Sequence, residues 1–192
     1  MDKNVRGLLE SKYVLFACEG TAEGVIMQTL YDSGAMIVPR DYVVKDNLFY
    51  TPYTRAKKPA DIVERFFGES YEVCGASGLL IARIVDSRSA KFKLPRRWEK
   101  SVVVESFYTR PEIEMLVIHA EGAYGDWQRA HRRDKQLRPN EFCKGTLKLP
   151  KIKEAQFLKS YWNPAKLIKA IHNYDNNRQH SNDEFSLGDL LA

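Results

Sequence analysis

The sequence predicts an α/β fold, with a mainly parallel central sheet flanked by helices. Three short apolar runs rich in strand-forming residues carry this prediction, at residues 12–18, 78–86 and 101–107. Nearly continuous apolar runs are typical of strands buried on both faces, as in parallel sheets. The segments between the runs have helical patterns, and strands that alternate with helices favour parallel pairing.

The first apolar run is followed by a predicted helix that ends at Gly34. Glycine readily adopts the left-handed conformation that closes many helices, and Thr21 is the expected N-cap. The run AMIVP at 35–39 predicts a second short strand. Residues 40–59 mix aromatic residues with turn signals and predict no regular element.

Two further helices are expected along the chain. The segment ADIVERFFG predicts a helix that ends at Gly68. Another helix is expected to begin with Pro111, because proline is favoured at the first helical position. Its predicted apolar face consists of Ile113, Leu116, Val117 and Ala120. From there the sequence predicts mostly basic helices up to about Tyr174.

One domain is expected. Residues 1–125 would form the α/β core, and residues 126–175 a helical, basic extension of the same domain. Residues 176–192 are predicted to be a flexible tail, whose last eight residues, FSLGDLLA, would be a frayed end or a small docking segment.

Composition excludes several classes of protein. The 192 residues are 44% hydrophobic and 29% charged, which is ordinary for a globular chain and too apolar for intrinsic disorder. No run reaches the roughly 20 apolar residues that span a bilayer, and the N-terminus lacks the pattern of a signal peptide. We therefore expect a cytoplasmic protein with no membrane partner. The widely spaced Cys18, Cys74 and Cys143 predict buried free thiols, because their spacing suits neither a disulfide framework nor a zinc site.

Positive charge is clustered along the chain. Residues 88–100 hold six basic residues and one acid, and residues 129–159 hold ten basic residues and three acids. The overall net charge is only +5, so the remainder of the chain is acidic. Such clusters favour a polyanionic partner, most simply nucleic acid, although a solvated lysine-rich surface is the alternative.

Two acids follow predicted strands. Glu19 comes directly after the first apolar run and precedes Gly20, which permits a tight turn or a close backbone approach; Asp86 ends the run at 78–86. Sites in parallel sheets lie beyond the carboxyl ends of the strands, and two carboxylates there can hold Mg²⁺. The alternative is that each acid caps a helix or lies in a loop.

These residues carry a resemblance to Toprim domains. The segment CEGTAE (Cys18 to Glu23) resembles the EGxTE-type signature that opens these catalytic domains of topoisomerases, bacterial primases and several nucleases. The segment IVDSR is similar to the second signature, DxD, with Asp86 at the first aspartate and Arg88 in place of the second. The segment RPEIEMLVIHAEG resembles NPxFExWLLxHF of RloB-like phage-defence proteins, with Pro111 and His119 near the matching positions.

The resemblance implies roles for the acids and for a divalent cation. Glu19 would be the general acid/base or a metal ligand, and Asp86 the main ligand of Mg²⁺ or Mn²⁺. Glu114 would be the third acidic group, with Glu112 as the alternative. Glu23 would orient the loop of Glu19 or cap the following helix.

The roles of Arg88 and His119 each have two interpretations. Arg88 would contact a phosphate, since its planar fork suits phosphate oxygens, or would pair with Asp86 or Glu19. His119 would support the site, but a satisfied core histidine is the simpler interpretation. An arginine cannot bind a metal ion, so the substitution of the second DxD acid argues against a two-metal site.

Basic residues interleaved with aromatic residues could hold a nucleic-acid backbone. The expected contacts are Lys91, Lys93, Arg96, Arg97 and Trp98, with Arg132 and Arg133 from a second wall. The alternative is an exposed loop whose aromatic side chains, Trp98 included, are tucked into the core.

Two functions remain open at this point. The first is metal-dependent cleavage of nucleic-acid phosphodiester bonds, by analogy in defence against phage and beside an ATPase partner protein. The second is a non-catalytic module, with a degenerate Toprim site, that binds nucleic acid or a nucleotide. The Arg88 substitution is the main support for the second.

Overall fold

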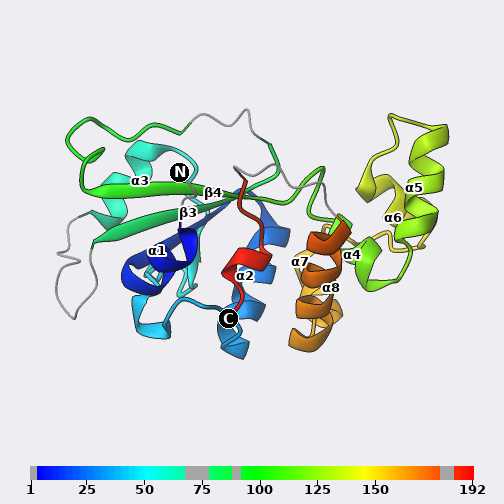
Figure 1. The fold of residues 1–192 in the computed structure, drawn as a ribbon, viewed down its shortest axis with the longest axis horizontal. Helices are drawn as coiled ribbons and strands as arrows, with labels where there is room; N and C mark the ends of the chain where they lie inside the picture. The colour runs from blue at the N-terminus through cyan, green and yellow to red at the C-terminus, as the bar shows by residue number, and fades with distance from the viewer. Residues whose placement is uncertain (1–3, 68–77, 88–91, 178–183) are drawn as a thin grey trace.

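A four-stranded, all-parallel sheet forms the centre of the protein (Figure 1). The computed structural model describes residues 4–67, 78–87, 92–177 and 184–192. The strand order is β2-β1-β3-β4. The strands are β1 (Tyr13–Cys18), β2 (Tyr53–Thr54), β3 (Leu79–Val85) and β4 (Val102–Tyr108). The α/β class and the three apolar strands are therefore confirmed.

The structure differs from the prediction for the fourth strand of the sheet. Strand β2 lies in the segment for which the sequence predicts no element. The strand expected at 35–39 is wrong, because Met36 makes only an isolated bridge to Leu191. Strand β2 is only two residues long, too short for any alternating pattern to reveal it.

Helices cover both faces of the sheet (Figure 1). The helices are α1 (Val5–Ser11), α2 (Thr21–Ser33), α3 (Pro59–Phe66), α4 (Met115–Ala120), α5 (Tyr124–Arg133), α6 (Pro139–Gly145), α7 (Ala155–Tyr161) and α8 (Pro164–Asn177), with short 3₁₀ turns at Arg40–Tyr42 and Gly188–Leu190. Alternate strand residues face the two layers: Phe16 and Leu80 pack in the core on the α2 side, and Leu15 and Ile81 in the core on the α3 side. This two-sided burial is why the strands read as continuous apolar runs.

The ends of two helices correct the sequence predictions. Helix α2 closes at Gly34, whose φ of 69° is left-handed as expected, but its N-cap is Gly20 and not Thr21. Helix α4 begins at Met115 and not at Pro111. The backbone N–H of Met115 donates to Glu112 O at 3.1 Å, so the residues before the helix form a turn.

The C-terminal residues pack into the core, which corrects the prediction of a flexible tail for 176–192. Leu187 and Leu190 are fully buried, and the Phe185 ring lies against Phe107 with 5.7 Å between centroids. The backbone N–H of Ala192 donates to Ala35 O at 3.0 Å. Residues 178–183, which belong to the predicted tail, lie outside the described residues.

The basic helices beyond residue 125 share the core of the sheet domain. Residues of α5, α6, α7 and α8 belong to the same buried cluster as α2 and the face of the sheet that packs on α2. Figure 1 shows α7 and α8 beside α2, whereas α5 and α6 lie at the far end of the molecule from α3. Cys18 and Cys143 are buried free thiols as expected; Cys74 and Gly68 lie outside the described residues. Among the described residues, no helix is long and apolar enough to cross a membrane.

The connections between strands create a switch point between β1 and β3. Strand β1 leads through α2, on one face, to β2 at one edge. The connection from β3 to β4 is described at residues 86–87 and 92–101, and its second part packs on the other face. Ligands of open α/β sheets bind beyond the carboxyl ends of the strands at such a point.

Candidate functional site

Glu19 and Asp86 flank this switch point. They follow β1 and β3, whose last residues include the paired Cys18 and Ile84. The backbone N–H of Asp86 donates to Glu19 Oε2 at 3.3 Å. The structure therefore brings together the two strand-end acids that the sequence singles out.

Three further acids lie close to this pair. Glu23 comes from the first turn of α2, and Glu112 and Glu114 from the turn between β4 and α4. A cavity of about 340 Å³ is lined by Glu23, Asp86, Glu112, Glu114, Arg55 and Lys153, among others. We call this hollow, with the adjoining Glu19, the acidic site. Glu112 and Glu114 can both line it because they lie in a turn, where side chains two residues apart need not point apart as they do on a helix.

Gly20 is the residue that allows Glu23 to approach the β1 loop. A Cβ atom at position 20 would lie 2.7 Å from Glu23 Oε2. Glu23 is only 7% exposed, so its carboxylate has little room to move away. The absence of a side chain at Gly20 leaves room for the Glu23 carboxylate, and Gly20 is also the N-cap of α2.

Mutual repulsion and burial disfavour the charged forms of these acids. Burial is the largest cause of the raised pKa of Glu23, and the charges of Glu114, Asp86 and Glu19 raise it further. Burial also raises the pKa of Glu19, and the charge of Asp86 adds to the effect. Burial likewise raises the pKa of Glu114, against the opposing effect of the Lys153 ammonium. A group of carboxylates in this state favours a nearby cation.

Two of the acids are held by protein partners. Lys153 Nζ lies 3.5 Å from Glu114 Oε1. Glu112 Oε2 accepts hydrogen bonds from the backbone N and the Nδ2 of Asn140, both at 3.1 Å. Glu112 is therefore fixed by the start of α6, and Glu114 is the more available of the two.

Basic side chains lie next to Glu19. A second hollow of about 160 Å³ is lined by Glu19, Lys57, Arg83 and Phe92, with neighbouring backbone. The Arg83 guanidinium lies 4.8 Å from the centre of the Phe92 ring. Burial lowers the pKa of Arg83, and the Glu19 charge opposes that shift. Glu19 thus adjoins both the acidic cavity and the hollow that Lys57 and Arg83 line.

The proposed nucleic-acid contacts are dispersed. Lys93, Arg96 and Arg97 are exposed in the connection between β3 and β4. The Trp98 indole packs edge-on against Phe67 with 4.9 Å between centroids, which is the core position that the sequence left open as the alternative.

Other predicted site residues are separated from the acids. Arg132 and Arg133 are exposed in the last turn of α5, at the far end of the molecule from α3 (Figure 1). His119 is buried and lines a separate cavity. Arg88 and Lys91 lie outside the described residues.

Four basic residues of the site escape sequence reasoning. Arg55 follows the two-residue strand β2, and Lys57 follows two positions later, in a segment without a recognisable pattern. Arg83 lies inside an apolar run, where one charged residue carries no signal by itself. Lys153 lies within the basic region at 129–159, but spacing along the chain cannot show that it folds back to Glu114.

The carboxylates fit a sparsely ligated hard cation. In the part of the chain that the structure describes, no three His, Cys, Asp or Glu side chains form a group able to hold a metal ion. Mg²⁺ is usually held by one or two carboxylates, with waters and substrate phosphates completing the shell. The pair of Glu19 and Asp86 supplies such a donor set. No match to the chain was found among protein-family models, curated proteins or solved structures.

Removing the charge of Glu23 is expected to stabilise the protein at neutral pH. A pKa that is higher in the folded than in the unfolded state makes stability fall as pH rises through that interval. Glu23→Gln should therefore raise the free energy of unfolding at pH 7.5, and the gain should vanish below the ordinary glutamate pKa of about 4.3. Urea unfolding at pH 7.5 and pH 4 measures this, with Glu64→Gln on the exposed face of α3 as control. Equal stability of wild type and Glu23→Gln at both pH values would refute the raised pKa of Glu23.

Proposed function

We propose that the protein cleaves phosphodiester bonds of nucleic acid at the acidic site, with Mg²⁺ or Mn²⁺ as cofactor, in the manner of a Toprim domain. The observation that carries the proposal is the meeting of Glu19 and Asp86 at the switch point of the sheet, where the backbone N–H of Asp86 donates to Glu19. Ligands of parallel sheets bind at this position, and paired carboxylates there suit a hard cation.

Asp86 is assigned the role of main ligand to the cation, with Glu19 beside it. When bound, a divalent cation polarises a phosphoryl oxygen and lowers the pKa of a water ligand. Glu114 lines the same cavity and pairs with the Lys153 ammonium, so that it neutralises part of this positive charge.

Glu19 is assigned the role of general base. Its raised pKa moves it toward the range in which a carboxylate accepts a proton efficiently near neutral pH. The oxygen of a water molecule forms the new bond to phosphorus, its proton passes to Glu19, and the P–O ester bond breaks. The departing oxygen takes a proton from solvent.

The basic side chains around the acids fit a phosphate substrate. Arg55 and Lys153 line the acidic site, and Lys57 and Arg83 line the hollow next to Glu19. Cations there offset the repulsion between a phosphodiester and the carboxylates. The exposed Lys93, Arg96 and Arg97 add positive charge along the β3–β4 connection, outside both hollows.

A cleavage assay tests the proposal. Purified, folded protein is incubated with end-labelled single- and double-stranded RNA and DNA, with Mn²⁺, with Mg²⁺ or with chelator. Cleavage of at least one substrate that requires the metal is the expected result. Absence of cleavage from all substrates by protein that unfolds cooperatively would overturn the proposal.

A second candidate function is a non-catalytic nucleic-acid- or nucleotide-binding module. It is favoured by the partners that Glu112 and Glu114 already have, because neither is then free to join Glu19 and Asp86 as the expected third acidic group. Binding that weakens steeply with salt and is indifferent to divalent metal would support this function. By analogy with RloB-like proteins, either function would serve phage defence beside an ATPase partner.

A further inference from the structure

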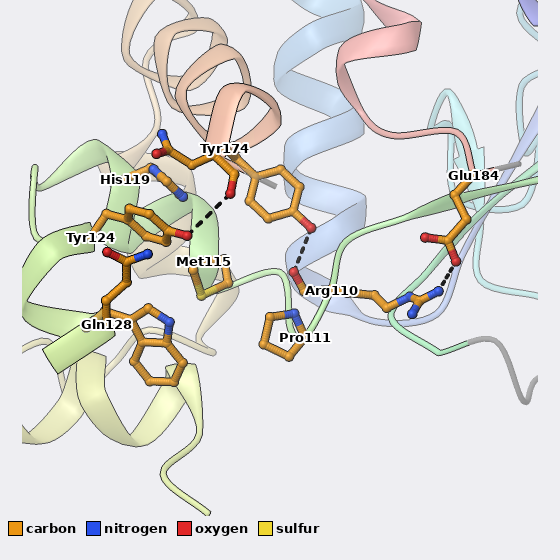
Figure 2. A pocket seen from close by; sticks show the side chains of 10 residues that line it. Arg110, Pro111, Met115, His119, Tyr124, Gln128, Tyr174 and Glu184 are labelled. Carbon is orange, nitrogen blue, oxygen red and sulfur yellow. Dashed lines mark hydrogen bonds and ion pairs between the residues drawn. The ribbon is translucent and has the colours of Figure 1, made fainter. Parts of the chain in front are cut away.

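A third hollow, of about 490 Å³, lies between α4, α5 and α8 (Figure 2). Four of its ten lining residues are aromatic, namely His119, Tyr124, Trp127 and Tyr174. We call it the aromatic pocket. Its volume is within the range of roughly 300–1,000 Å³ typical of small-molecule sites. Figure 2 shows the rings of His119 and Tyr124 side by side and Tyr174 across from them.

The aromatic walls are held in place by their neighbours. The His119 ring stacks on Tyr124 with 4.5 Å between centroids, and meets Tyr174 edge-on at 5.9 Å. The Tyr174 hydroxyl donates to Arg110 O at 2.6 Å, and the Tyr124 hydroxyl to Asn177 O at 3.3 Å. Both phenols are thus anchored at their polar ends, so the rings form fixed walls.

The lining carries no net charge at neutral pH. Arg110 and Glu184 form an ion pair at one end of the pocket. Burial lowers the pKa of His119 to about 4, so that this ring is neutral. Gln128 lies at the exposed rim, and no hydrogen bond to another described residue engages its side-chain amide. A neutral pocket with stacked rings and one free amide fits a neutral, planar ligand that carries hydrogen-bonding groups at its edge.

The aromatic pocket shares a wall with the acidic site. Arg110, Pro111 and Met115 line the aromatic pocket. Glu112 and Glu114, from the same turn, line the acidic site. The two hollows therefore lie on either side of one short segment, and a chain molecule that crosses it can reach both.

We propose that the aromatic pocket binds one nucleobase of a single-stranded nucleic acid whose backbone crosses the acidic site. This inference rests on the proposed function and names its substrate as single-stranded. A base in a duplex is stacked on its neighbours and cannot enter, whereas an unpaired base can leave the strand and stack on aromatic side chains. The Gln128 amide then faces the edge of the base.

Equilibrium binding of a labelled hexanucleotide, measured by fluorescence anisotropy in chelator, tests the inference without cleavage. The variants are Tyr124→Leu, which removes a wall, and Gln128→Glu, which replaces the amide by a charge of the same shape. Gln156→Glu, on the exposed face of α7 and outside both cavities, adds the same charge as a matched control. Loss of one base stack predicts binding about 5- to 100-fold weaker for Tyr124→Leu, and Gln128→Glu should also weaken it. Thermal unfolding confirms that both variants are folded.

Three further ligands sharpen the test. A hexanucleotide of abasic sites should bind wild type and both variants equally, and duplex DNA should bind more weakly than single strands. Tight binding of free adenosine monophosphate, equal to that of the hexanucleotide, would overturn the assignment to a strand. Equal binding of the hexanucleotide by wild type, Tyr124→Leu and Gln128→Glu would overturn the pocket itself. Cleavage that Tyr124→Leu leaves unchanged refutes this inference alone, whereas base-dependent binding without cleavage refutes only the proposed function.

Discussion

Replacing Glu19 by Gln or Asp86 by Asn is expected to abolish metal-dependent cleavage. Each change keeps the shape of the side chain and removes the negative charge that would hold a cation or take a proton. Removing a general base alone costs about 10²- to 10⁴-fold in rate, so a loss of at least about 100-fold is expected for each. Initial rates with the best substrate of the cleavage assay measure the effect.

The control for these variants carries the same chemical change elsewhere. Asp61→Asn and Glu64→Gln lie on the exposed face of α3, outside both hollows. They should retain the wild-type rate. If Glu19→Gln and Asp86→Asn kept wild-type rates as well, the activity would belong to another site or to a contaminant.

Truncating Leu187 to alanine is expected to destabilise the whole domain. Leu187 is fully buried in the core that contains α2 and the sheet, beside Leu190. Loss of a buried leucine side chain leaves a cavity and costs about 2–5 kcal/mol. Urea unfolding followed by circular dichroism should show this loss in Leu187→Ala. Leu48→Ala is the matched control, because Leu48 is 70% exposed.

Comparing Leu187→Ala with Leu48→Ala shows whether the C-terminal residues are packed in the core or frayed. If residues 184–192 were a frayed end, Leu187→Ala and Leu48→Ala would have equal and small effects. A large effect of Leu187→Ala alone is expected, because the C-terminal residues pack against α1, α8 and Phe107 of β4.

The sequence predicts the centre of the fold better than its edges. Strands β1 and β3 are buried on both faces and leave long apolar runs, so they are visible from the residues alone. Strand β4 lies at the edge and is mostly half-buried, but its three consecutive valines still form an apolar run. Strand β2 has two residues and leaves no such run. The C-terminal FSLGDLLA follows a polar segment, and only the folded core shows that its leucines have somewhere to pack.

The apolar runs also allow part of the candidate site to be predicted. Glu19 and Asp86 directly follow apolar runs, and the geometry of parallel sheets brings such positions together. The sequence singles out Glu114 as a candidate, but it predicts a helix from Pro111. In the structure Glu114 lies in a turn before α4, and this turn lets it line the cavity. The approach of Lys153 to Glu114 depends on the packing of helices far apart in the chain, which no local pattern encodes.

Mn²⁺ binding measured by isothermal titration calorimetry tests the central claim most directly, because it asks whether the acidic site holds a cation without requiring the right substrate. Wild-type protein is compared with Asp86→Asn and with Asp61→Asn. We expect saturable binding of Mn²⁺ by wild type and by Asp61→Asn, and at least tenfold weaker binding by Asp86→Asn, since the main charged ligand is lost. Equal affinity of all three proteins, or no binding by wild type, would contradict a metal centre at the switch point of the sheet.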